Sequence, residues 1–187
     1  MAETDAALVA RAQAQRGAFE ALYRRYADAV YWYCLRELRD PDAAEDVASE
    51  VFAKALVALP GYQERVGSSF RSWLFRIAHN AIVDAVRADR RNEKLDAAAN
   101  LIDTEPTPEE AALLVGQQRW LLEAMEYLTE DQRRLVGLRL AGLTGGEIAT
   151  VLERNRSWVD TTYFRAVARL RVLLDAGTGE EATNVRG

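Results

Sequence analysis

The stretch from residue 69 to residue 91 constrains the fold of this chain more than any other segment. Apolar side chains recur in it at steps of three and four residues, the spacing that places them on one face of an α-helix. Ser68 or Ser69 stands where it can cap the first turn. The pattern predicts a long helix with one buried face, formed by Phe70, Trp73, Leu74, Ile77, Ala78, Ala81, Ile82, Ala85 and Val86.

The same stretch is rich in arginine, which interrupts the apolar pattern together with His79 and Asn80. Guanidinium groups bind phosphates, and large aromatic rings stack on unpaired bases. The helix therefore suggests contact with nucleic acid. An alternative is a solvated helix whose C-terminal arginines are favoured by the helix dipole.

The composition favours a helical protein without an enzymatic site. The chain has 187 residues, of which 49% are hydrophobic, and only four prolines. One cysteine and one histidine provide no disulfide, no nucleophilic triad and no rich metal site, so we expect no catalytic residue, no metal and no cofactor. Cys34 is expected to be a small buried hydrophobe. No apolar run reaches about 18 residues and the N-terminus is polar, which predicts no membrane insertion and a cytoplasmic location.

Charge is segregated along the chain, whose formal net charge is −5. Acidic residues cluster in 37–50 and 93–110, whereas arginines collect in 65–91 and 133–171. This alternation predicts that different surfaces meet different partners.

Capping signals and apolar periodicity predict an all-α fold of two small helical domains joined by a flexible acidic linker. Helices are expected at 4–15, 18–38, 42–59, 69–91, 107–128, 129–142, 145–152 and 155–174. Thr107, Thr129 and Thr144 each precede a Glu or Gln by three residues, which is typical of a capping box. Inward positions of the second helix are Phe19, Leu22, Tyr23, Tyr26, Val30, Tyr33 and Leu38. The predicted organisation is a first domain at 1–91, a linker at 92–107, a second domain at 108–175 and a disordered tail at 176–187.

The last two predicted helices have the short–turn–long pattern of a helix-turn-helix, in which the second helix enters the major groove of DNA. Its apolar positions are Ile148, Ala149, Leu152, Val159, Tyr163, Ala166 and Leu170. Base contacts are expected from Arg156, Ser157, Asp160, Thr161 and Arg165, and phosphate contacts from Arg154, Arg165 and Arg169. A plain helical hairpin is the alternative.

Several segments together resemble one family, the extracytoplasmic-function (ECF) RNA polymerase sigma factors. The resemblance covers residues 5–174 and rests on AFEALYRRYADAVY, DPDAAEDVASEVFAKAL, FRSWLFRIAHNAIVDAVRADRR and LTEDQRRLVGLRLAGLTGGEIATVL, in this order. It implies a protein that binds core RNA polymerase and directs promoter recognition and transcription initiation. The alternative is a polymerase-independent helix-turn-helix repressor or a helical interaction protein, and a repressor would bind duplex DNA tightly by itself.

The resemblance also implies roles for individual residues. A surface that docks on the clamp of the polymerase β′ subunit would comprise Glu45, Asp46, Glu50 and Phe52, with carboxylates flanking an exposed phenylalanine. Recognition of the minus-10 element would involve Tyr62, Arg71, Arg76, Asn80, Arg87, Arg90 and Arg91. Asn80, Asp84 and Arg87 match an N-xxx-D-xx-R pattern, in which Asn80 is the best candidate for touching DNA, while Asp84 and Arg87 are alternatively residues that orient their neighbours. The minus-35 element would be bound by Arg154, Arg156, Ser157, Asp160, Thr161, Arg165 and Arg169.

The implied partners are core RNA polymerase, through its β′ and β subunits, promoter DNA and an anti-sigma protein that covers the polymerase-binding faces. The chain departs from the family at the helix-turn-helix. Glu153 and Arg154 stand where glycine and an apolar residue are usual, and Asp160 and Thr162 stand where Lys and Arg are usual. A carboxylate near phosphates is repulsive unless it accepts from a cytosine amino group. These departures predict weak or unusual binding of the upstream element.

Overall fold

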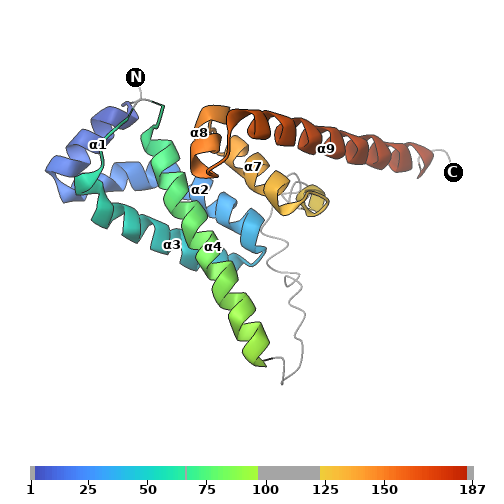
Figure 1. Ribbon diagram of the computed structural model, residues 1–187, viewed down its shortest axis with the longest axis horizontal. Helices are drawn as coiled ribbons and strands as arrows, with labels where there is room; N and C mark the ends of the chain where they lie inside the picture. Colours follow the sequence, from blue (N-terminus) through green and yellow to red (C-terminus); the bar gives the residue numbers. More distant parts are fainter. Residues whose placement is uncertain (1–2, 66, 97–122, 185–187) are drawn as a thin grey trace.

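The computed structural model describes residues 3–65, 67–96 and 123–184, and within these ranges every regular element is a helix. This confirms the all-α prediction. The first unit contains α1 (Asp5–Ala14), α2 (Phe19–Leu38), α3 (Pro41–Ala58) and α4 (Phe70–Asp96), with short 3-10 turns at Arg16–Ala18 and Leu59–Gly61. The second unit contains α7 (Glu130–Leu140), α8 (Gly145–Val151) and α9 (Arg156–Asn184). Figure 1 shows α4 and α9 as the two long helices that extend away from the centre of the molecule.

Local capping explains where most helices begin. Thr4 accepts a hydrogen bond from the backbone of Ala7 at the start of α1, and Asp40 does the same for Ala43 at the start of α3, where Pro41 occupies the first helical position. Complete capping boxes open α7 at Thr129 and α8 at Thr144. These hydrogen bonds confirm the predicted helix starts. Each capping signal involves residues only a few positions apart, so the sequence alone contains it.

The core of the first unit lies where α2, α3 and α4 pack together. The inward prediction for α2 is confirmed at Phe19, Leu22, Tyr26, Val30 and Tyr33, all of which are buried. It is wrong for Tyr23, which is 48% exposed and lays its ring edge on Phe52. Cys34 is fully buried, and burial raises the pKa of its thiol to about 12, so it is the predicted small hydrophobe.

The long helix α4 buries the predicted face and two further residues. Phe70, Leu74, Ala78, Ala81 and Ile82 are buried, and Trp73, Ile77, Ala85 and Val86 pack partly exposed against the core. Phe75 and Ser72 are also buried, although the pattern did not predict them. The Ser72 hydroxyl is satisfied because it donates to the Ser69 carbonyl at 2.9 Å.

The second unit packs directly on the first, with α7 against α2 and α8 against α4 (Figure 1). Leu135, Leu138 and Ile148 are fully buried and belong to the same apolar cluster as the residues of the first unit. Gly137 allows this approach, since a Cβ there would lie 3.0 Å from a ring carbon of Tyr33. The sequence predicted two domains but not this contact between them.

Two predicted boundaries differ from the structure. Helix α4 continues to Asp96, so the first residues of the predicted linker are helical. Helix α9 continues to Asn184, so the prediction of a disordered tail from 176 is wrong over that range. Once a helix is nucleated, each further residue adds a hydrogen bond at low cost, which permits such extensions. The predicted start at Thr107 and the rest of the linker lie outside the described residues. Nowhere in the described part is a helix both long and apolar enough to cross a bilayer.

Candidate nucleic-acid and protein interfaces

One side of α4 presents a stripe of exposed polar residues, which we call the arginine stripe: Arg76, Asn80, Arg87 and Arg91. Steps of four and seven residues keep them on the same side of the helix. Asp84 lies between them, with its carboxylate 4.0 Å from an Arg87 nitrogen. This ion pair fits the alternative in which Asp84 orients Arg87. The stripe brings together most of the residues predicted for the minus-10 element; the side chain of Arg90 lies outside the described residues.

An aromatic pair continues the arginine stripe at the N-terminal end of α4. The rings of Tyr62 and Trp73 lie 4.9 Å apart and both residues are partly exposed. Tyr62 also packs edge-on against the buried Phe70, at 5.7 Å between ring centres. Burial raises the pKa of the Tyr62 hydroxyl, with a smaller contribution from Glu64. The pair provides ring surface beside guanidinium groups, the combination that binds single-stranded bases.

Arg71 does not belong to the stripe. Its Nη1 donates to the carbonyl of Gly142 at 3.0 Å, and its guanidinium lies 5.8 Å from the ring centre of Tyr26. Gly142 has a φ of +86°, and a Cβ there would lie 2.7 Å from Arg71 Nη1. Arg71 therefore joins the two units in this structure. The prediction that Arg71 contacts DNA came from its residue type and the family resemblance, and neither reports a partner 71 residues away.

The exposed side of α3 is acidic. Glu45, Asp46 and Glu50, which we call the acidic face, are all exposed, and Glu50 pairs with Lys54 at 2.7 Å. The prediction of an exposed phenylalanine among them is wrong. Phe52 is only 6% exposed, because it shares the buried side of α3 with Ala48 and Ala55.

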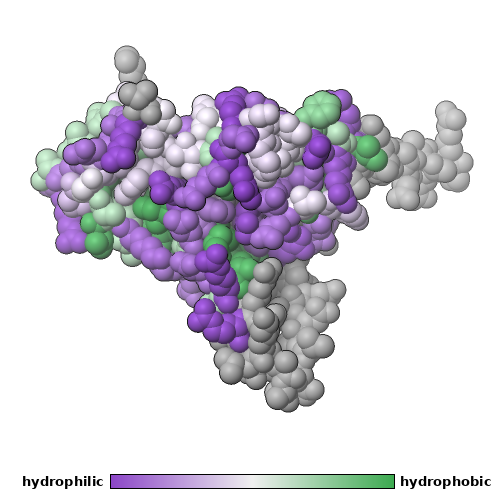
Figure 2. Space-filling view, viewed as in Figure 1, coloured by the Kyte–Doolittle hydropathy of each residue, from purple (hydrophilic) through white to green (hydrophobic). Residues whose placement is uncertain are grey.

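An exposed aromatic ring beside Phe52 belongs to α2. Tyr23 packs on Phe52 with 4.7 Å between ring centres and leaves nearly half of its own surface exposed. The face of the whole molecule drawn in Figure 2 is mostly hydrophilic, with small separate hydrophobic patches.

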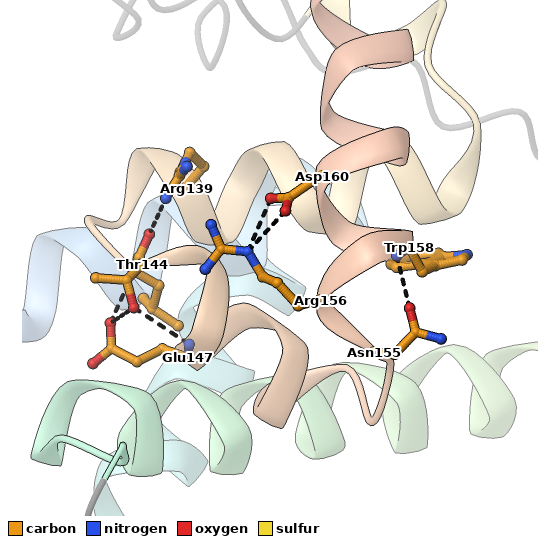
Figure 3. A network of polar contacts seen from close by, with 8 residues as sticks. Arg139, Thr144, Glu147, Asn155, Arg156, Trp158 and Asp160 are labelled. Carbon is orange, nitrogen blue, oxygen red and sulfur yellow. Dashed lines mark hydrogen bonds and ion pairs between the residues drawn. The ribbon is translucent and has the colours of Figure 1, made fainter.

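Helices α8 and α9 form the predicted helix-turn-helix. The turn reverses at Glu153, whose φ is +53°, and the Arg154 amide donates to the Ala149 carbonyl at 2.9 Å. This is the left-handed ending for which glycine is the usual residue. Asn155 then caps α9 by accepting from the Trp158 amide at 2.8 Å (Figure 3). Arg154 lies over the Trp158 ring at 5.3 Å, which fixes its guanidinium beside the start of α9.

All seven residues predicted to contact the minus-35 element are exposed, on the turn and on α9: Arg154, Arg156, Ser157, Asp160, Thr161, Arg165 and Arg169. Two of them interact. Arg156 Nε donates to both carboxylate oxygens of Asp160, at 2.9 and 3.0 Å. The sequence analysis did not predict this pair, although a spacing of four residues on a helix is the signal for it.

Glu147 links the helix-turn-helix to the first unit. Its carboxylate closes the capping box with Thr144, at 2.8 Å from the Thr144 amide, and also accepts from the Ser69 hydroxyl. Partial burial alone would raise the pKa of Glu147, but these hydrogen bonds outweigh it and the pKa lies below its usual value. The anionic carboxylate therefore stabilises both the start of α8 and the contact with α4.

A second contact between the units buries ionisable groups. The Glu37 side chain is 4% exposed, and its Oε2 lies 3.6 Å from Arg134 Nε. Burial raises the pKa of Glu37 to about 7, and Arg134 and Arg133 only partly offset it. Nearby, His79 Nδ1 lies 3.3 Å from the Tyr33 hydroxyl, and burial lowers the His79 pKa to about 4. Among the described residues, no three His, Cys, Asp or Glu side chains are grouped to hold a metal ion.

Comparison with known proteins identifies the family. The sequence model of Sigma-70 region 2 matches residues 22–92, and that of Sigma-70 region 4 matches residues 118–170. The ECF RNA polymerase sigma factor SigK of Mycolicibacterium vanbaalenii is 30% identical over 177 residues, which cover 92% of this chain and 90% of SigK. The chain belongs to the ECF sigma factors. Its relative BldN of Streptomyces coelicolor is 35% identical over 175 residues, which cover 89% of this sigma factor and 64% of BldN's own length.

Solved structures agree with this family. CnrH, in complex with the cytosolic domain of CnrY, shares 26% identity with this sigma factor, with a TM-score of 0.67 over 90% of this chain and 96% of CnrH. RpoE of Bartonella quintana, in complex with the anti-sigma factor NepR, shares the fold at 21% identity and a TM-score of 0.68, over 84% of this chain and 96% of RpoE. Membership of this family excludes the main alternative, a polymerase-independent repressor, because a sigma factor acts together with core RNA polymerase.

Proposed function

We propose that this sigma factor docks on core RNA polymerase through the acidic face of α3. Glu45, Asp46 and Glu50 present carboxylates to solvent without a buried ion pair, so they are available to a basic partner surface. Tyr23 supplies an exposed ring at the neighbouring helix, in place of the buried Phe52. Charge complementarity of this kind increases the association rate and fixes the register of a complex, while the aromatic centre contributes affinity.

Promoter recognition is divided between the two units. The arginine stripe of α4, with Tyr62 and Trp73 at its end, would bind the minus-10 element, where bases leave the duplex. The exposed face of α9 would bind the minus-35 element in the major groove. The observation that supports this division is the placement of two separate arginine-bearing helix faces, each exposed and each joined to aromatic or capping residues that fix its geometry.

A charge reversal tests the docking surface. Asp46→Arg should abolish co-purification with core RNA polymerase and promoter-dependent run-off transcription, because it places a cation where a basic partner surface must approach. The fold should survive, since Asp46 is exposed. Asp131→Arg makes the same charge change at an exposed position of α7 and is the matched control for net charge. Unchanged co-purification of Asp46→Arg would refute the assignment.

A protein partner that competes with core polymerase is also proposed. CnrH, which is similar to this sigma factor, was solved with the cytosolic domain of CnrY bound. An anti-sigma protein that covers the acidic face would explain how such a factor is kept inactive. Adding that partner to the assembled holoenzyme should release the sigma factor from core polymerase, and a stable ternary complex would contradict a shared surface.

A further inference from the structure

The guanidinium of Arg156 is held between two residues of different helices. On one side, Asp160 accepts from Arg156 Nε with both oxygens, at 2.9 and 3.0 Å. On the other side lies the backbone of Gly145, in the first turn of α8. Figure 3 shows Arg156 reaching from α9 toward Thr144 and Glu147 at the start of α8, with Asp160 on the α9 side of its guanidinium.

Gly145 is required for this placement. A Cβ at residue 145 would lie 2.6 Å from Arg156 Cζ and 2.9 Å from its Nε and Nη1, closer than a Cβ approaches a non-bonded atom in proteins. Glycine destabilises a helical turn relative to alanine. The close contact with Arg156 gives a reason for glycine at this position. Because the clash is with the end of a flexible side chain, alanine at 145 would displace the guanidinium and leave the helix intact.

Asp160 is required for a different reason. The N-terminus of α8 carries the positive end of the helix dipole, which disfavours a cation beside it. The Asp160 carboxylate offsets this repulsion and selects one rotamer of Arg156. The single Nε–H is shared between the two carboxylate oxygens, which orients the Asp160 carboxylate toward Arg156 on its own helix.

The arrangement leaves the other two guanidinium nitrogens available. Within the described ranges, no residue accepts a hydrogen bond from Arg156 Nη1 or Nη2, and the side chain remains 57% exposed. Two parallel N–H groups of this kind match the O6 and N7 acceptors that guanine presents in the major groove. An arginine that is already ordered also loses less conformational entropy on binding.

We propose that Gly145 and Asp160 are positioning residues that hold Arg156 so that its Nη1 and Nη2 bind one guanine of the upstream promoter element. This rests on the proposed function, in which α9 enters the major groove. It also gives Asp160, a departure from the usual basic residue, a role that does not require contact with DNA.

The test is selection of promoter fragments with a randomised upstream element by holoenzyme reconstituted from core RNA polymerase and the full chain. Wild type should select guanine at one position, by about 5- to 100-fold over other bases, and Arg156→Ala should lose that preference alone. Gly145→Ala and Asp160→Asn should reduce it about 2- to 10-fold, the effect of releasing one ordered side chain. Gly146→Ala is the matched control, since a Cβ there would lie 4.0 Å from Arg156 Nη1.

Each result bears on the proposal. A guanine preference that survives Arg156→Ala overturns it, and so does one that disappears with Arg156→Ala but is unchanged in Gly145→Ala and Asp160→Asn. If Asp160→Asn binds all sequences more strongly and keeps the guanine preference, Asp160 only neutralises the charge of Arg156. That result would overturn its role as a positioning residue. Holoenzyme that initiates transcription but shows no preference at any upstream position would instead refute the assignment of α9 to the minus-35 element.

Discussion

Glu37 should make the stability of this sigma factor fall as pH rises through the weakly acidic range. Its side chain is 4% exposed between α2 and α7, and burial raises its pKa from 4.5 to about 7. Between these values the folded chain keeps a proton that the unfolded chain has lost. The free energy of unfolding therefore decreases with pH there, at up to about 1.4 kcal/mol per pH unit and by about 3 kcal/mol in total.

His79 acts in the opposite direction over an overlapping range. Its pKa is lowered from 6.5 to about 4, so the unfolded chain binds the additional proton and stability rises with pH in that interval. The two contributions offset each other in the wild type. They are separated by measuring urea unfolding of wild type, Glu37→Gln, His79→Gln and the double variant at a series of pH values.

The difference in unfolding free energy between wild type and Glu37→Gln should decrease by about 3 kcal/mol from pH 4.5 to pH 7. Glu50→Gln is the control, because the Glu50 side chain is 51% exposed and an exposed ion pair contributes less than about 1 kcal/mol. Parallel pH profiles for wild type and Glu37→Gln would show that Glu37 titrates alike in the folded and unfolded chains, and would refute the reasoning.

Three further predictions follow from single positions. Glu153→Gly should raise the urea-unfolding free energy by about 1 kcal/mol, because the residue has a φ of +53°; a loss of stability would contradict this. Leu138→Ala should lower the same quantity by about 2–5 kcal/mol, since Leu138 is fully buried in the cluster shared by both units, and a change below about 1 kcal/mol would contradict that packing. Arg165→Ala should flatten the log–log salt dependence of promoter binding by holoenzyme by about 0.9 if Arg165 contacts one phosphate, and an unchanged slope would exclude that contact.

Local signals in the sequence predicted the helices well. Thr4, Thr129 and Thr144 each cap a helix through partners three residues away, so the sequence contains the whole motif. The apolar spacing of α4 similarly identified its buried face. The error at Phe52 came from assigning it to the surface by analogy, although Ala48 and Ala55 place it on the buried side of α3.

Contacts between distant segments could not be predicted in this way. Arg71 had the residue type expected at a DNA interface, but its hydrogen bond goes to Gly142 in the other unit. Gly145 lies in the first turn of a helix, where glycine is unfavourable by local propensity, and its close neighbour, the guanidinium of Arg156, belongs to another helix. In both cases the decisive partner lies on another helix, and no periodicity within one segment reports it.

The apolar cluster common to both units limits what this conformation can bind. Elements named for positions minus 10 and minus 35 are separated by about 25 base pairs, or about 85 Å of duplex at about 3.4 Å per pair. A unit of this size is about 30 Å across, and α8 rests directly on α4. One straight promoter cannot occupy both helix faces while Leu138 and Ile148 remain packed on the first unit. With the minus-10 element on α4 and the minus-35 element on α9, as proposed, initiation requires the two units to separate and these leucine and isoleucine side chains to be exposed or covered by another surface. The free energy of their packing then opposes assembly with the promoter.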